Sequence, residues 1–414
     1  MHLRFVLMTI LFACFFFHPL VHPSFAQPVT EETVPPPNIE SPMPAPSTVE
    51  EPPQLEIPAL ETQDAMIVLG ELRANVRTSP ESAEQRLKLA QGLYRIGDLD
   101  AAIEECRVAI RLNQDNAKAH LQLGVILMAK QDWRAAASVL KEAIRLDPSM
   151  AHAHYSLGSV QYSMGKTAAA IQSYREALEW QSYFPDARYR LALLLKLTHQ
   201  DREAAQLMEE AALGGVSQAQ FFLGNAHKSG QGVEKNLAQA IYWWTKAVEL
   251  GHQPAAEALS KLRRQALSPK PSKRQREALD AFRLYSDKLW EQFPDYPRID
   301  DGETLGTTLL MHNRADYALS ILLKESYALD EVSTSELVRL YHIGWDPHLA
   351  PFDKTILTCL ETTAAEGFAP AKKALARIYG KGIGLDPDLP KAKSILKGLP
   401  KQERQAVLDE LGAP

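Results

Sequence analysis

The chain has 414 residues, of which 45% are hydrophobic and 23% are charged, and its formal net charge is −6. This balance is typical of a globular protein long enough for two or three domains. The negative charge is concentrated in residues 27–64, which contain eight acids and no Lys or Arg, so the rest of the chain is close to neutral. Composition therefore excludes the strongly basic field of a nucleic-acid-binding protein, and we expect no nucleic-acid partner.

Residues 1–26 have the features of an export signal. A basic start is followed by an apolar run over residues 5–17, which is too short to span a bilayer comfortably. Ser24 and Ala26 place small residues at the −3 and −1 positions of a cleavage site. We expect cleavage after Ala26 and a location in the periplasm or cell envelope. The alternatives are lipidation at Cys14, which would attach the chain to a membrane, and an uncleaved anchor.

Residues 27–64 are predicted to form an acidic, disordered spacer, because they contain ten of the 27 prolines and their acids repel one another. The alternative is a ligand for an aromatic groove. In residues 65–82, apolar side chains recur at helical spacing, which predicts a helix that caps the region after it.

Residues 83–213 contain four copies of a 34-residue repeat. Three columns of positions recur in register, namely Leu89-Ala90, Leu123-Gly124, Leu157-Gly158 and Leu191-Ala192; then Ala102, Ala136, Ala170 and Ala204; then Ala109, Ala143, Ala177 and Ala211. A fixed period of this length predicts stacked helix pairs, each too small to bury its own apolar face. The expected fold class is therefore all-α, an αα-superhelix or α-solenoid, preceded by the disordered Pro-rich segment.

These units resemble the tetratricopeptide repeat, and the second unit matches its pattern best, at Leu123, Gly124, Ala136, Ala143 and Pro148. The resemblance implies two helices per unit, with the first helices lining a concave face. It also implies a scaffold that binds a protein or peptide partner.

Residues 214–262 resemble a Sel1-like repeat. The resemblance rests on a Gly-x-Gly-Val turn at 230–233 and on the helical segment 238–247, which contains Trp243 and Trp244. In this family, aromatic residues at those positions pack inside the repeat; the alternative is an exposed aromatic interface.

Residues 263–276 are basic and contain prolines, which predicts a solvated domain linker. Contact with an acidic lipid or polymer is the alternative. Residues 277–414 are predicted to form a diverged helical, Sel1-like domain. One clear copy lies at 371–399, and a weaker one lies between 335 and 367.

No motif in the sequence indicates catalysis, a cofactor or a metal. The glycines at 230–232 and 382–384 superficially resemble phosphate loops, but helices are expected on both sides, so we interpret them as turn residues. His152 and His154 are two residues apart and point to different helix faces, which does not suit a metal site. Cys106 and Cys359 are too sparse to indicate a disulfide framework. We therefore predict a protein that is not an enzyme.

The concave face of the first helices is the candidate binding groove. Helical phase predicts that it displays tyrosines, cations and apolar side chains, which suit an extended peptide. The candidate residues are Tyr94, Lys118, Leu121, Met128, His152, Tyr155, Tyr162, Tyr189 and Lys196. The alternative is that many of these side chains simply cover the inner surface.

Three hypotheses follow. The first is an exported, non-enzymatic scaffold that binds a peptide or partner protein, with a role in cell-envelope assembly. The second is an oligomeric structural subunit of an envelope complex, joined through the open ends of the solenoid. The third is a cell-wall-related enzyme with a site in residues 277–370, where Ser335, Glu336 and His342 are available without a recognisable spacing.

Overall fold

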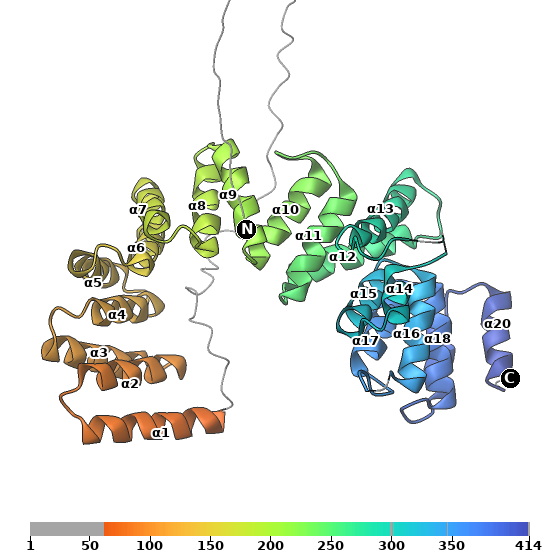
Figure 1. The fold of residues 1–414 in the computed structure, drawn as a ribbon, viewed down its shortest axis with the longest axis horizontal. Helices are drawn as coiled ribbons and strands as arrows, with labels where there is room; N and C mark the ends of the chain where they lie inside the picture. Colours follow the sequence, from red (N-terminus) through yellow and green to blue (C-terminus); the bar gives the residue numbers. More distant parts are fainter. Residues whose placement is uncertain (1–61, 299, 301, 346, 413–414) are drawn as a thin grey trace, which may run out of the picture. The chain divides into compact units, whose positions relative to one another are not determined.

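The computed structural model describes residues 62–412 except 299, 301 and 346 (Figure 1). This part of the chain folds into helices α1 to α20 and contains no β-strand, which confirms the predicted all-α fold. The predicted signal peptide lies outside the described residues, as does the predicted spacer up to residue 61. The last three spacer positions, 62–64, belong to α1 (Thr62–Thr78).

Eight helices follow α1 and form the four predicted helix pairs. Their bounds are Ala83–Arg95 (α2), Leu99–Leu112 (α3), Ala117–Ala129 (α4), Trp133–Leu146 (α5), Ala151–Ser163 (α6), Thr167–Trp180 (α7), Pro185–Leu197 (α8) and Asp201–Leu213 (α9). Several of these helices have a polar N-cap. Asp98, Asn116 and Asp132 each accept a hydrogen bond from the backbone amide three residues later. Each helix packs against the next along the chain, as expected for a solenoid.

The repeated small residues are packing positions. All eight alanines of the two alanine columns are buried. A Cβ atom added at Gly124 would lie 2.6 Å from the side chain of Leu140, and one added at Gly158 would lie 2.9 Å from Tyr174. Small residues at this position therefore allow the two helices of a unit to approach closely.

The turn inside each pair requires a left-handed residue, but only two units provide glycine there. The φ angles are 82° at Gly97 and 75° at Gly165, and 61° at Gln131 and 59° at His199. A side chain with a Cβ is disfavoured in this region by about 1 kcal/mol or more.

Gln131→Gly and His199→Gly should each raise the free energy of unfolding by about 0.5–1 kcal/mol. Urea denaturation measures the free energy of unfolding. The reverse change, Gly165→Gln, should lower this free energy. A lower free energy of unfolding in Gln131→Gly or His199→Gly would contradict the prediction.

The next helices are α10 (Ser217–Ser229), α11 (Leu237–Glu249), α12 (Gln253–Ala266) and α13 (Lys273–Trp290). Trp243 and Trp244 are buried, so the packing interpretation is confirmed and an exposed aromatic interface is wrong. Gly230 and Gly232 have φ angles of 78° and 74° in the turn between α10 and α11, as expected of turn residues.

The predicted linker 263–276 is wrong over most of its length. Helix α12 continues to Ala266 and α13 begins at Lys273, so only residues 267–272 separate the two helices. The predicted boundary at residue 277 falls inside α13. Arg263 is buried rather than solvated, because it forms an ion pair with Glu366, which is distant in sequence.

The remaining helices are α14 (Leu305–Met311), α15 (Ala315–Tyr327), α16 (Glu331–Ile343), α17 (Lys354–Glu366), α18 (Ala369–Lys381), α19 (Leu389–Ile395) and α20 (Lys401–Glu410). Gly382 and Gly384 take left-handed φ angles of 69° and 70° after α18, again as turn residues. Helix α15 contributes to two apolar cores: Ile321 belongs to the core of α11–α15, and Leu322 belongs to the core of α15–α20. No helix within the described ranges is both long and apolar enough to cross a membrane.

Candidate functional site

The first helices of the first three repeats lie next to one another, since α4 contacts both α2 and α6. Four of the candidate groove residues expose their side chains: Lys118, His152, Tyr162 and Lys196. Tyr94, Leu121 and Tyr189 are partly buried. These seven residues are available to a ligand to different degrees.

Two of the accessible groove residues rest on aromatic rings of the following unit. The ring of His152 lies 5.0 Å from that of Phe184, and the ammonium group of Lys196 lies 4.2 Å from the ring centre of Phe222. Such contacts restrict the side chains and present their polar atoms outward. The groove therefore carries positioned polar groups on an apolar base.

Tyr155 and Met128 do not belong to the groove surface, which corrects the prediction at these two positions. Both are buried, at 3% and 4% exposure. The ring of Tyr155 packs 5.0 Å from Phe184 and 5.6 Å from Tyr174, and burial raises the pKa of its hydroxyl. Helical phase alone could not predict this, because Phe184 folds over from the segment that begins α8.

Arg190 is a groove-region residue that the phase analysis missed. Its positive charge acts on the hydroxyl of Tyr155, and its guanidinium group lies 6.0 Å from the ring centre of Tyr189. It follows Tyr189 directly on α8, so a search that included the neighbours of the predicted positions would have found it.

The histidines of the second and third units have structural partners. The buried His154 lies 3.0 Å from a carboxylate oxygen of Glu176 and 2.9 Å from the carbonyl oxygen of Pro148. His120 lies 3.3 Å from the carbonyl oxygen of Gln114. In the part of the chain that the structure describes, no group of three or more His, Cys, Asp or Glu side chains is placed to hold a metal ion.

The structure does not bring Ser335, Glu336 and His342 together as a catalytic group. All three lie on α16, where Ser335 donates a hydrogen bond to the carbonyl oxygen of Glu331 and Glu336 pairs with Arg339. No hydrogen bond joins Ser335 to His342 among the residues described. A nucleophile without a base within hydrogen-bond reach does not form a site for nucleophilic catalysis.

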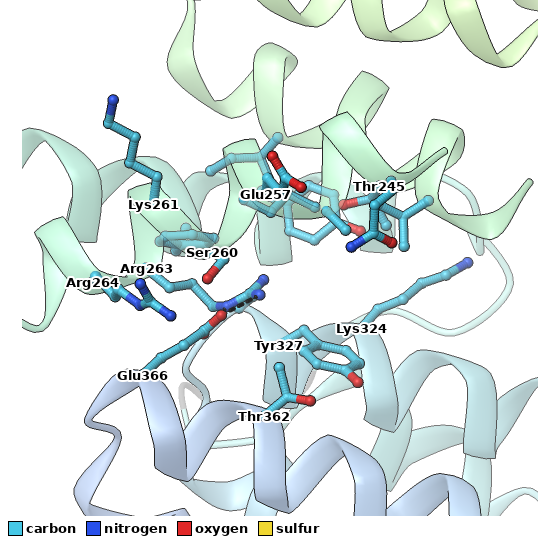
Figure 2. A pocket seen from close by; sticks show the side chains of 18 residues that line it. Thr245, Glu257, Ser260, Lys261, Arg263, Arg264, Lys324, Tyr327, Thr362 and Glu366 are labelled. Carbon is cyan, nitrogen blue, oxygen red and sulfur yellow. Dashed lines mark hydrogen bonds and ion pairs between the residues drawn. The ribbon is translucent and has the colours of Figure 1, made fainter. Parts of the chain in front are cut away.

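A pocket of about 660 Å³ lies among α11, α12, α13, α15 and α17, and Ser335, Glu336 and His342 do not line it (Figure 2). Apolar side chains from α11 and α13 line it, including Ile241, Val248, Phe282 and Tyr285. Ligand sites in proteins commonly have volumes of about 300–1,000 Å³ and mostly apolar walls.

A buried ion pair forms one wall of this pocket. The guanidinium group of Arg263 makes two hydrogen bonds to the carboxylate of Glu366, one of which, from Nη2 to Oε1, measures 2.9 Å. The same guanidinium lies 5.3 Å from the ring centre of Tyr327, and burial raises the pKa of that tyrosine to about 12. Figure 2 shows Arg263 and Glu366 facing each other from opposite helices. The pair joins α12 to α17.

Family models match three segments of the chain. The tetratricopeptide repeat model matches residues 121–183, and the Sel1 repeat model matches residues 217–252 and 369–397. Both predicted resemblances are therefore confirmed. The weaker Sel1-like copy between 335 and 367 remains a prediction.

Several known proteins are similar to parts of the chain. DAP3-binding cell death enhancer 1 of Rattus norvegicus is 37% identical over 71 residues, which are 17% of this chain and 14% of that protein. A crystal structure of MamA is 25% identical and covers 41% of this chain and 97% of its own, with a TM-score of 0.34. A structure of Pseudomonas aeruginosa pilF is 20% identical and covers 48% and 90%, with a TM-score of 0.42.

Proposed function

We propose that this chain, a tetratricopeptide-repeat protein with Sel1 repeats, is an exported, non-enzymatic scaffold that binds an extended peptide or partner protein. The binding site is the groove formed by the first helices of residues 83–213, and the setting is the cell envelope. Repeats of these families typically serve protein–protein interaction, and long repeat arrays present extended concave surfaces.

The observation that carries the proposal is the set of accessible side chains on α4, α6 and α8. Lys118, His152, Tyr162 and Lys196 are exposed, and Leu121 and Tyr189 are partly buried. Hydroxyl and amine groups can bind the backbone and acidic side chains of a peptide, while the rings provide apolar contact area. These six residues are called the groove residues below.

The groove is tested by changing three of its residues together: His152→Ala, Tyr162→Ala and Tyr189→Ala. Partners recovered with the tagged full-length chain from an envelope extract should lose at least tenfold in yield, since aromatic residues in contact surfaces often contribute 2 kcal/mol or more. Quantitative mass spectrometry of the bound fraction measures the loss.

The matched control for the groove variant is Trp180→Ala, which removes an aromatic side chain that is 55% exposed at the end of α7. This change should leave the recovered partners unaltered. An identical set of partners with the wild-type and groove variants would remove the groove from the proposal. Export is tested with the same tagged chain, which should appear in the envelope or periplasmic fraction without residues 1–26.

A further inference from the structure

We propose that the pocket among α11, α12, α13, α15 and α17 is a second binding site, which accepts a large apolar side chain of an acidic peptide. The pocket is formed by other helices than the groove residues, so the two sites do not share a side chain. It is called the junction pocket below.

The interior of the junction pocket selects an apolar group. Apolar side chains line the pocket, including Ile241, Val248, Ala256 and Phe282. Removing an apolar side chain from water contributes about 25 cal/mol per Å² of its buried surface. A pocket of about 660 Å³ has room for a large aliphatic or aromatic side chain.

Part of the polar lining of the interior is already satisfied within the chain. Arg263 is paired with Glu366, and the hydroxyl of Thr362 donates a hydrogen bond to the carbonyl oxygen of Thr358. An apolar occupant leaves these groups satisfied. A polar occupant would lose its bonds to water without replacing them.

The rim of the junction pocket carries excess positive charge. Lys261 and Arg264 line it on the α12 side and have no carboxylate within 4 Å among the described residues, while Lys324 lies on the opposite side (Figure 2). Lys324 is paired with Glu249 at 2.7 Å, and Glu257 is the single opposing carboxylate on the rim. Two unpaired cations beside an apolar cavity favour a ligand with carboxylates flanking its apolar group.

The test uses a fluorescein-labelled hexapeptide, Glu-Asp-Leu-Trp-Asp-Glu, and the full-length chain at about 0.15 M salt, where the Debye length is about 8 Å. Fluorescence anisotropy should show saturable binding. The paired change Lys261→Glu and Arg264→Glu should weaken binding at least tenfold. The matched control, Lys270→Glu with Arg274→Glu, reverses two exposed cations outside the pocket and should change the Kd less than twofold. Ala256→Trp, which fills the pocket from α12, should also weaken binding at least tenfold.

Two further probes test the chemistry of the ligand. A peptide with Lys in place of its four acids, or with Gly in place of Leu and Trp, should bind at least tenfold more weakly. Equal binding of either probe would overturn the proposal, as would equal responses of the two charge-reversal variants. Loss of binding in the variant with His152→Ala, Tyr162→Ala and Tyr189→Ala would show that the peptide binds in the groove. That result would also overturn the proposal.

Discussion

Replacing Glu366 with Ala should lower the free energy of unfolding of the region around α12 and α17 by about 3–5 kcal/mol. The change leaves the guanidinium group of Arg263 buried without a counter-charge, and breaking a buried pair from one side typically costs this much. The side chains of Arg263 and Glu366 are only 6% and 3% exposed, so the pair has little contact with solvent. Urea denaturation measures the loss, and hydrogen exchange should show faster exchange in α12 and α17.

Two further variants separate the loss of a partner from the loss of the pair itself. Replacing both residues, Arg263→Met with Glu366→Leu, removes both charges and should lower stability much less than Glu366→Ala alone. Glu104→Ala breaks an exposed pair with Arg107 and should change stability by less than about 1 kcal/mol. If Glu366→Ala behaved like Glu104→Ala, the buried pair would not hold α12 to α17.

The stability of the α14–α16 region should fall by about 2.5 kcal/mol as the pH rises from 5 to 8, because of Glu325. Burial raises the pKa of this carboxyl from 4.5 to about 7, against the opposing effect of hydrogen bonds from Ser333 and from the amides of Gly306 and Leu305. A group whose pKa is higher in the folded state than in the unfolded state makes its full contribution to stability at pH values below its pKa in the unfolded state. That contribution disappears as the pH rises through the folded pKa. Chemical denaturation at several pH values between 5 and 8 measures it.

Glu325→Gln is the control for this pH dependence, because the side chain keeps its shape and cannot ionise. The difference in stability between the wild type and this variant should change by about 2.5 kcal/mol over the same pH range. Contributions from the other titrating groups, including nearby Asp330, largely cancel in that difference. A difference that stays constant with pH would show that Glu325 has the same pKa in both states.

The architecture of the repeats could be predicted because close helix packing requires small residues at fixed positions of the sequence. A Cβ atom added at Gly124, Gly158 or Gly224 would lie less than 3 Å from a side chain of the neighbouring helix. A larger residue would push the helices apart, so small residues recur at this position of the repeats. The same argument explains the alanine columns and the burial of Trp244, which packs against Gly224.

The details of the two candidate sites could not be predicted because they depend on contacts between distant segments. Tyr155 was assigned to the groove by its phase on α6, but Phe184 from the next unit covers it. The charge of Arg263 indicated a solvated linker, and only the approach of α17 reveals its partner Glu366, 103 residues later. Local periodicity contains no information about such pairings.

Helix α15 has a consequence for how the chain unfolds. Ile321 and Leu322 are neighbours in sequence, yet each belongs to a different apolar core. An ideal repeat array can lose its terminal units one at a time, because each unit contacts only its neighbours. Here, melting α15 exposes apolar surface in both cores at once, and the pairing of α12 with α17 adds a second link across the same region. The segment from α11 to α20 should therefore unfold in one cooperative transition, while the units before it can fray in steps from α1.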